Sequence, residues 1–412
     1  MSTRHTRRRF IQAGTVAGAL ALAGCVGDDT ADDEPAETAR DYEVWLTDQG
    51  TDTVHILEED PDADPIGYEE VDQIDVGEVH GTDIVGPHLI DFTSDWEYAV
   101  SADTGAGTLT IYDADSREIV ETVETGPGTH MGGVRAYSAM LEGEERNDER
   151  IIVDVINDAA IREVEADWEN YEFEIVDEID FMEHEELQEG PMPNPQPICH
   201  DITQDGSMSY HTVGAGIDDA AVVRVDIEAF EIDEVIMPDE LRANCGVIRQ
   251  PGTNRFWFTG GAPSSHESGG VGQWYVYDAD DQEVIASGSS GGFDAHGIWF
   301  GPTFEDVDDI SEAWVFNRET NDAVVIDTEE LTVIDYVEET GTAPDIVAGT
   351  PGNDYMLASL RGPEPQSGDP HASTGDTPGM SIIDPETREI LDIVEPNPID
   401  ESDMHAANVR LL

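Results

Sequence analysis

The sequence contains no lysine, so its 18 basic residues are all arginines, set against 93 acidic residues for a formal net charge of -75 over 412 residues. This imbalance excludes nucleic acid as a partner, because no basic surface is available to neutralise phosphates. Carboxylates stay hydrated in strong salt, and strong salt screens their mutual repulsion, so the composition predicts a halophilic surface. With 38% hydrophobic residues, 39 glycines and 7 tryptophans, the chain can still bury a core.

A long apolar run is also missing. The apolar stretch Ala13–Ala23 is too short to span a bilayer as a lasting helix. It follows Thr6–Ile11 (TRRRFI) and ends in Leu22–Cys25 (LAGC), which resemble a twin-arginine export signal and a lipobox. The resemblance, to twin-arginine-exported lipoproteins of the haloarchaeal type, implies a signal peptide over residues 1–24, a lipid on Cys25 and a location on the extracytoplasmic face of the cell membrane. The alternative is an uncleaved N-terminal anchor.

Helical periodicity is missing from the rest of the chain. Residues 25–41 are acidic and poor in apolar side chains, which predicts a disordered tether after Cys25. From Tyr42 onward, short β-branched and aromatic runs alternate with turn residues, most clearly in Trp96–Ser101, Gly107–Asp113 and Glu118–Val123. This pattern predicts strands and returns roughly every 50 residues, so residues 42–412 are predicted to be all-β.

One of the repeats carries a family resemblance. The stretch Val325–Val347, with its Ala343-Pro344, resembles the YVTN-type propeller repeat. The resemblance extends over residues 42–412 and implies a seven-bladed β-propeller, a fold shared by enzymes, carriers and surface proteins. The first repeat begins without an inner strand, and the chain ends in Asn408–Leu412 with no blade after it. The C-terminal strand is therefore predicted to complete the first blade and close the ring.

Residues at similar places in the repeats are rich in histidine. The set is His80, His130, His200, Cys245, His296, Pro344 and His405. A proline stands at this position in the YVTN-like repeat, and it is retained here at Pro344. Twelve histidines in 412 residues would put about 0.2 of one at seven random positions, whereas the set holds five. Residues just before inner strands face the channel of a propeller, so the sequence predicts imidazoles and a thiol around one axis.

Such a ring predicts a metal site, because neutral imidazole and thiolate bind Zn and Cu. The thioethers of Met131 and Met404 would favour copper. The predicted ligands are His80, His130, His200, Cys245, His296 and His405. Acceptors for their second N–H groups are predicted at Asp83, Asp201, Asp294 and Asp403.

A site without metal is the alternative. The histidines would then be hydrogen-bonded at blade crossings, or would line a watery channel. The remaining histidines of the propeller are predicted to be surface or packing residues, and they are His55, His88, His184, His211, His266 and His371.

Three cysteines are present, and they leave one choice open. With a lipid on Cys25, the thiols of Cys199 and Cys245 would lie in an oxidising compartment and could form a disulfide. A disulfide would remove Cys245 as a ligand and leave five histidines, whereas free thiols would leave a His/Cys centre. The disulfide requires Cα atoms within about 7 Å of each other.

Three functions are compatible with these features. The first is a membrane-anchored metal carrier or chaperone, monomeric and serving a metal transporter. In export, fold and channel histidines it is similar to the propeller-type zinc metallochaperones. The second is a metalloenzyme that uses the same ring, as the propeller of nitrous oxide reductase does for copper, although no cupredoxin domain follows here. The third is a metal-free surface scaffold or adhesion propeller. Nucleophile-elbow, dinucleotide and P-loop motifs are absent from the sequence, so the second reading depends on the metal alone.

Overall fold

The computed structural model describes most of the chain from Tyr42 onward, within the compact unit Ala39–Leu412. The predicted signal peptide, Cys25, the tether, Asp83 and His371 lie outside the described residues. No described helix is long and apolar enough to cross a membrane. The described ranges are 42–81, 84–134, 148–189, 195–214, 220–236, 241–267, 269–301, 310–351, 354–364, 366 and 373–412.

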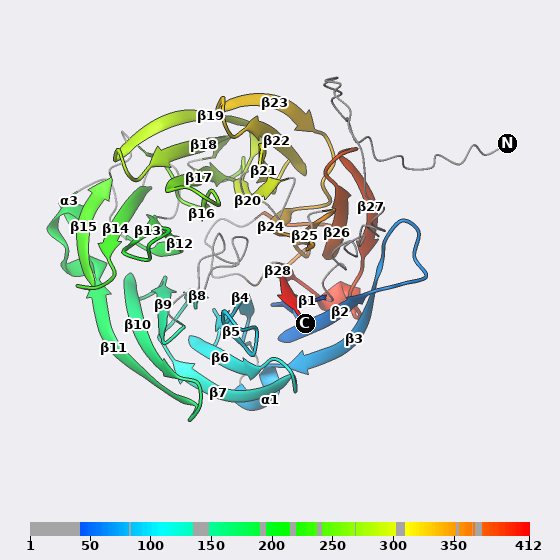
Figure 1. Cartoon of the computed structure of the whole chain (residues 1–412), viewed down its shortest axis with the longest axis horizontal. Coiled ribbons are helices and arrows are strands. Elements are labelled where there is room, and N and C mark those ends of the chain that lie inside the picture. Colours follow the sequence, from blue (N-terminus) through cyan, green and yellow to red (C-terminus); the bar gives the residue numbers. More distant parts are fainter. Residues whose placement is uncertain are drawn as a thin grey trace, which may run out of the picture. The chain divides into compact units, whose positions relative to one another are not determined.

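The strands form seven four-stranded antiparallel sheets that stand as blades around a central axis (Figure 1). This is the seven-bladed β-propeller that the sequence predicts. From the axis outward, blade 1 is β28 (Met404–Leu411), β1 (Tyr42–Asp48), β2 (Thr53–Glu59) and β3 (Tyr68–Asp75); blade 2 is β4 (Pro87–Phe92), β5 (Tyr98–Asp103), β6 (Thr108–Asp113) and β7 (Glu118–Glu124); blade 3 is β8 (Thr129–Gly133), β9 (Arg150–Val155), β10 (Ala160–Asp167) and β11 (Glu172–Asp180).

The other four blades repeat this order. Blade 4 is β12 (Pro197–Ile202), β13 (Met208–Val213), β14 (Ala221–Asp226) and β15 (Glu231–Ile236); blade 5 is β16 (Val247–Arg249), β17 (Arg255–Ala262), β18 (Gly270–Asp278) and β19 (Glu283–Phe293); blade 6 is β20 (Ala295–Gly301), β21 (Glu312–Asn317), β22 (Asp322–Asp327) and β23 (Thr332–Val337); blade 7 is β24 (Pro344–Gly349), β25 (Met356–Leu360), β26 (Gly379–Asp384) and β27 (Glu389–Val394).

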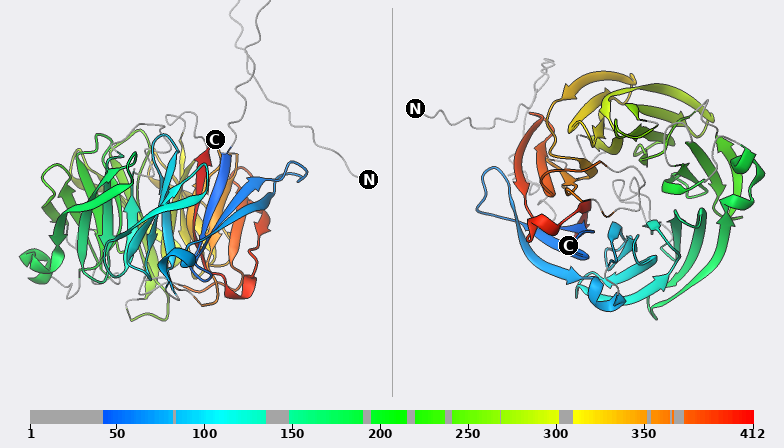
Figure 2. Two further views of the ribbon diagram at one scale, coloured as in Figure 1. Left: turned by 90° about the horizontal axis from the view of Figure 1, so that it is seen from below. Right: turned by 180° about the vertical axis from the view of Figure 1, so that it is seen from behind.

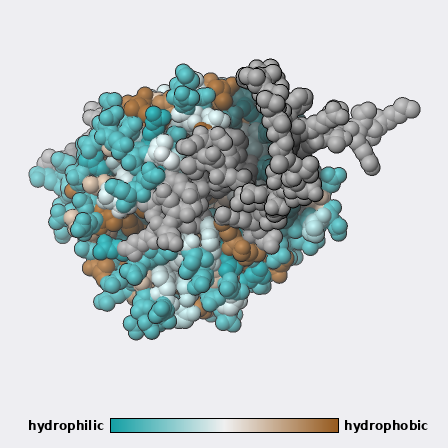
Figure 3. Space-filling model, in the orientation of Figure 1, coloured by the Kyte–Doolittle hydropathy of each residue, from teal (hydrophilic) through white to brown (hydrophobic). Residues whose placement is uncertain are grey.

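Short helices lie between the strands. Among the described residues they are α1 (Gly77–His80), η1 (Phe181–Glu183), α3 (Glu185–Glu189) and η4 (Ile399–Glu401). Hydrophilic residues cover much of the described surface in one view (Figure 3), as the acidic composition predicts.

Aspartates at the ends of the third strands of the blades organise the outer hairpins. Asp113 accepts the backbone N–H of Ser116 at 2.8 Å, and Asp226 accepts that of Ala229 at 2.9 Å. Asp384 does the same with Glu386 at 2.8 Å. The carboxylate satisfies turn N–H groups that the sheet leaves unpaired, which explains why the acid recurs in the sequence.

The C-terminal strand closes the ring, as predicted. β28 pairs with β1, from Met404 opposite Asp48 to Leu411 opposite Tyr42. Figure 2 shows the two strands side by side at the meeting point of the first and last blades. Met404 and Val409 pack into the same apolar cluster as Val44 and Leu46 of β1. The last residues of the chain therefore supply the strand nearest the axis for blade 1.

Candidate functional site

The register of the inner strands decides which residues lie nearest the axis. In five blades the inner strand begins with a paired residue, followed by a break in the register. The five paired residues are Pro87, Thr129, Pro197, Ala295 and Pro344. The residue after each of them is therefore structurally equivalent from blade to blade. In blade 1, Met404 pairs with Asp48, which puts His405 at the same level.

Backbone carbonyls at this level accept a hydroxyl from the preceding blade. Thr47 Oγ1 donates to His88 O at 2.7 Å, and Thr259 Oγ1 donates to His296 O at 3.0 Å. Thr212 Oγ1 donates to Cys245 O at 2.7 Å, so Cys245 belongs to the same level. We call this level the axial ring, and its members are His88, His130, Ile198, Cys245, His296, Asp345 and His405.

Three of the predicted positions are thus wrong. His80 lies on α1 between blades 1 and 2, and its place in the ring is taken by His88, which the sequence analysis assigned to packing. His200 lies two residues after Ile198 on β12, where it is paired with His211 of β13. Asp345 replaces Pro344. His130, Cys245, His296 and His405 stand in the predicted ring.

Three imidazoles of the axial ring lie against one another. The ring centroids of His88 and His405 are 3.3 Å apart, and those of His88 and His130 are 3.9 Å apart. All three side chains are buried. Burial, His130, His405 and Arg361 hold the pKa of His88 well below its usual value. Burial and Arg361 do the same for the pKa of His405, although Asp345 opposes them.

A chain of hydrogen bonds fixes these imidazoles. His405 Nδ1 donates to His88 O at 3.1 Å, His88 Nδ1 donates to His130 O at 3.1 Å, and His130 Nδ1 donates to Ile198 O at 2.7 Å. Each carbonyl belongs to the next blade. Because Nδ1 carries the proton, the neutral ring has its lone pair on Nε2. The histidines therefore link blades 1 to 4 around the axis.

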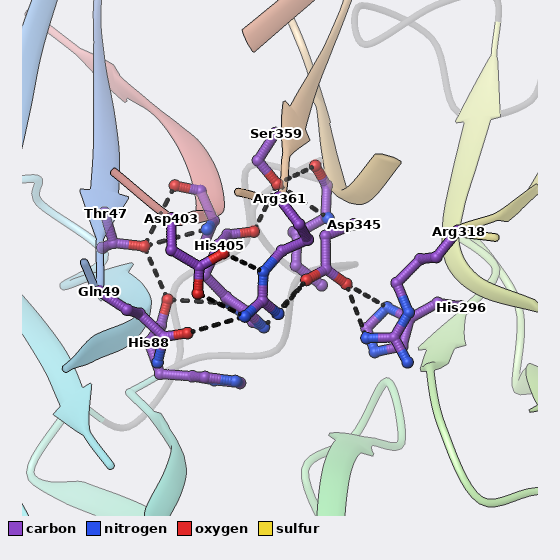
Figure 4. A network of polar contacts seen from close by, with 12 residues as sticks. Thr47, Gln49, His88, His296, Arg318, Asp345, Ser359, Arg361, Asp403 and His405 are labelled. Carbon is purple, nitrogen blue, oxygen red and sulfur yellow. Dashed lines mark hydrogen bonds and ion pairs between the residues drawn. The ribbon is translucent and has the colours of Figure 1, made fainter. Parts of the chain in front are cut away.

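Asp345 lies between two arginines and two histidines (Figure 4). His405 Nε2 lies 3.5 Å from Asp345 Oδ2, and His296 Nδ1 lies 3.0 Å from Oδ1 without the alignment of a hydrogen bond. Arg361 approaches Asp345 to 2.8 Å and Arg318 to 3.3 Å. Burial alone would raise the pKa of Asp345, but the two histidines and two arginines hold it well below its usual range.

Two of the neighbouring aspartates bind these arginines, and a third binds a backbone N–H group. Arg318 donates twice to Asp294, at 2.9 and 3.0 Å. Arg361 donates twice to Asp403, at 2.8 and 2.7 Å. Asp201 accepts the backbone N–H of Arg249 at 2.7 Å. The prediction that these three aspartates accept a ring N–H is therefore wrong. His405 donates its Nδ1 proton to the backbone carbonyl of His88, His200 Nδ1 lies against Asp154, and His296 Nδ1 lies against Asp345.

His80 lies near a buried carboxyl group. Its Nε2 is 3.0 Å from Thr110 Oγ1 and 3.7 Å from Asp103 Oδ2. Asp103 accepts hydrogen bonds from Ser101 at 2.8 Å, Thr108 at 3.0 Å and Thr110 at 2.5 Å. Burial raises the pKa of Asp103 to about 7, Asp52 adds to the rise, and the three hydroxyls reduce it.

Stability is expected to fall as this carboxyl ionises. An unfolded aspartate has a pKa of about 3.9, so between about pH 4 and pH 7 the folded chain holds a proton that the unfolded chain has released. The free energy of unfolding should decrease across this range by up to about 4 kcal/mol and level off above it. Denaturant unfolding at constant salt should show a shallower pH slope for Asp103→Asn. Equal slopes would contradict the assignment.

A second buried cluster joins blades 3 and 4. Asp154 on β9 contacts two imidazoles, with Oδ2 at 2.5 Å from His200 Nδ1 and Oδ1 at 2.7 Å from His211 Nδ1. His200 belongs to β12 and His211 to β13. All three side chains are buried, and Ser209 Oγ lies 2.9 Å from His211 Nε2. We call Asp154, His200 and His211 the Asp/His cluster.

The carboxylate of this cluster is held ionised. Burial alone would raise the pKa of Asp154, but His200 and His211 lower it well below its ordinary value. Burial would lower the pKa of His200, and Asp154 raises it above the usual value. For His211 burial prevails, so its pKa is lowered.

The donor atoms of the Asp/His cluster suit a metal ion. One nitrogen or oxygen from each residue lies within 4.8 Å of the others. Among the described residues, this is the group of at least three His, Cys, Asp or Glu side chains whose donor atoms come that close together. In the axial ring, by contrast, both oxygens of Asp345 already contact guanidinium groups. A cation there would meet two positive charges, so the Asp/His cluster is the better site.

Two cavities reach His200. One, of about 100 Å³, lies on the axis and is lined by residues of all seven inner strands or the segments leading into them, His296 among them. The other, of about 520 Å³, lies between blades 3 and 4, and its charged lining residues are Arg150, Asp205, Asp226 and Glu228. Met131 lines both cavities, and its sulfur accepts the backbone N–H of His200 at 3.2 Å. His200 and Met131 therefore stand between the two spaces.

The two cysteines are buried thiols in this structure rather than a disulfide. Thr212 Oγ1 lies between their backbones, 3.3 Å from Cys199 O and 2.7 Å from Cys245 O. Cys199 packs in the apolar cluster between blades. Cys245 is in the axial ring but not in the Asp/His cluster.

Comparison with known proteins supports the fold. Neither a protein-family model nor a curated protein matches this sequence. Among solved structures, the chain is similar to a 6-phosphogluconolactonase-like protein from Bacteroides fragilis, with a TM-score of 0.61 and 11% identity over 91% of this chain and 99% of that one. It is also similar to hydrazine synthase of Kuenenia stuttgartiensis, with a TM-score of 0.54 and 12% identity over 76% and 87% of the two chains. The third is the dihydro-heme d1 dehydrogenase NirN, with a TM-score of 0.53 and 12% identity over 89% and 74%. At these identities the likeness is one of fold, and the chain is a seven-bladed β-propeller.

Proposed function

We propose that this propeller is an extracytoplasmic, lipid-anchored metal-binding protein that carries Zn or Cu in the Asp/His cluster. The observation that carries the proposal is the meeting of one carboxylate and two imidazoles from different strands, all buried, with donor atoms within 4.8 Å of one another. Buried polar groups of this kind are costly unless they bind one another or an ion.

The donor set fits the proposed ions. Two imidazole nitrogens and one carboxylate oxygen are typical zinc ligands, and three protein ligands leave a coordination position for exchange. The thioether of Met131, next to His200, would add affinity for copper. Ser209 at His211 Nε2 orients that ring in the way that groups behind metal-bound histidines do.

A carrier role follows from access to the cluster. The cavity between blades 3 and 4 is lined by His200 and by three acidic residues against one arginine, Arg150, which is itself paired with Glu163 at 2.8 Å. The excess of negative charge attracts cations and lowers the barrier to entry. The N-terminal export and lipobox-like segments support a place on the outer face of the membrane, where a transporter could take the ion. The runner-up is a metalloenzyme that uses the same ion.

Metal analysis after export-competent expression in high salt tests the proposal. We expect about one Zn or Cu per chain, and a fall of at least tenfold in affinity for His211→Leu and for Asp154→Asn, since each removes a ligand. Chelator should lower the melting temperature of the unmodified protein and leave that of His211→Leu unchanged.

His296→Leu is the matched control, because it removes a buried histidine outside the Asp/His cluster. It should retain the metal. Loss of metal in His296→Leu with retention in His211→Leu would move the ion to the axial ring. A protein that takes up neither Zn nor Cu would support the metal-free scaffold and overturn the proposal.

A further inference from the structure

The axial cavity carries two carboxylate–imidazole pairs on its wall. His200 from blade 4 and His296 from blade 6 both line it. Asp154 lies behind His200 at 2.5 Å, and Asp345 lies behind His296 at 3.0 Å. Both carboxylates are completely buried. The hydrogen bond from Nδ1 to Asp154 fixes the His200 imidazole and leaves Nε2 as its nitrogen for a ligand, whereas Asp345 acts on His296 through its charge.

The rest of the wall is mainly apolar. It includes Leu89, Met131, Val247, Ile298 and Ile346. Gly246 and Gly297 also line the cavity. An added Cβ at these positions would come within 2.5 Å and 2.2 Å of a backbone oxygen of the next blade, so the close approach of the blades requires glycine there. Such a surface favours a ligand that is largely apolar.

The other polar side chains on the wall are already engaged. Asp91 accepts the backbone N–H groups of Phe92 at 2.8 Å and Val134 at 3.0 Å. Asp201 accepts that of Ile202 at 2.7 Å, besides that of Arg249. Asn408 donates to Ile90 O at 2.8 Å. The two imidazoles are therefore the groups best placed to hydrogen-bond a ligand in this cavity.

We propose that the axial cavity binds a small uncharged molecule, largely apolar and carrying a hydroxyl or carbonyl group that hydrogen-bonds to His200 or His296. A water needs roughly 10–15 Å³ of such space, so the cavity of about 100 Å³ holds a ligand of about seven non-hydrogen atoms. Anions are excluded by the carboxylates of the wall and by the net charge of -75, and the apolar wall disfavours cations. This inference does not rest on metal binding.

Phenol and toluene test the proposal, because both have seven non-hydrogen atoms and differ by a hydroxyl in place of a methyl group. Phenol should shift the ring ¹⁵N signals of His200 and His296 and leave those of His55, a buried histidine of blade 1, unchanged. Toluene should bind about tenfold more weakly, since it cannot form the hydrogen bond. Benzoate, an anion, should not compete with phenol.

Variants separate this site from the Asp/His cluster. His296→Leu should weaken phenol binding and leave metal content unchanged, whereas His211→Leu should lose metal and still bind phenol. Equal binding of phenol and toluene to the unmodified protein would overturn the proposal. So would unmoved signals of both His200 and His296 at saturating phenol, or competition by benzoate.

Discussion

Replacing Arg361 by methionine is expected to lower the free energy of unfolding by about 3–5 kcal/mol. The Arg361 guanidinium is completely buried and donates to Asp403 at 2.8 and 2.7 Å and to Asp345 at 2.8 Å. Methionine fills a similar volume but leaves both buried carboxylates without this cation. The penalty is large because removing one partner leaves the other charge buried and uncompensated, which costs more than the intact pair contributes to stability.

The expected effect also has a structural consequence. Asp345 belongs to blade 7, Asp403 precedes the inner strand of blade 1, and Arg361 follows β25. The same guanidinium approaches Gln49 of blade 1 at 3.3 Å. Arg361 therefore links the two blades at which the ring closes, and its loss should weaken closure in particular.

Denaturant unfolding of Arg361→Met beside Arg388→Met checks this expectation. Arg388 is also paired with two carboxylates, that of Asp335 and, at 3.0 Å, that of Glu312. Its side chain, however, is 22% exposed. Its loss should cost about 1 kcal/mol or less, and the cost should shrink in high salt. The double variant Arg361→Met/Asp403→Asn should recover part of the stability lost by Arg361→Met. Similar costs for the two arginines would contradict the argument.

The fold could be predicted from the sequence because its signals are local. Short alternating strands, turn aspartates such as Asp113, and a C-terminal strand without a blade are each visible within a few residues. Each depends on hydrogen bonding and burial inside one hairpin or one blade. Repetition then fixes the architecture, since every blade must bury its faces against the next.

The site was harder to predict, because it depends on register. Turn lengths differ between blades, and the similar places in the repeats were assigned to His80 instead of His88, although Pro87 directly precedes His88 as Ala343 and Pro344 precede Asp345. Taking the residue that follows such a proline as the ring position would have marked Asp345 after Pro344. At Pro197 it would have placed Ile198, not His200, in the ring.

The carboxylate of the Asp/His cluster carried no signal of its own in the sequence. Asp154 is one of 93 acidic residues, and it faces His200 only because blades 3 and 4 pack side by side. His211 was assigned to packing, although the β12–β13 hairpin places it opposite His200. The feature of the sequence that predicts this cluster is a pair of histidines opposite each other in a predicted hairpin, both on its buried face.

A chain that ends at Asp403 is expected not to fold. The truncation removes β28 and with it every backbone pair to β1, from Met404 opposite Asp48 to Leu411 opposite Tyr42. It also removes Met404 and Val409 from an apolar cluster. The lost burial and hydrogen bonds are comparable with the whole free energy of folding, which is about 5–15 kcal/mol for a typical protein. The exposed edge of β1 would in addition promote aggregation.

Circular dichroism melting and size-exclusion chromatography in high salt measure the effect of this truncation. Deleting only Leu412, which is 63% exposed, is the control and should leave the melting temperature unchanged. Arg410→Met should fall between the two, since it keeps the strand but removes the guanidinium that contacts Glu43 at 3.1 Å and the Ala114 carbonyl at 2.8 Å. A cooperative melt in the chain that ends at Asp403 would mean that six complete blades hold the ring without β28. Closure by the C-terminus would then not be the basis of its stability.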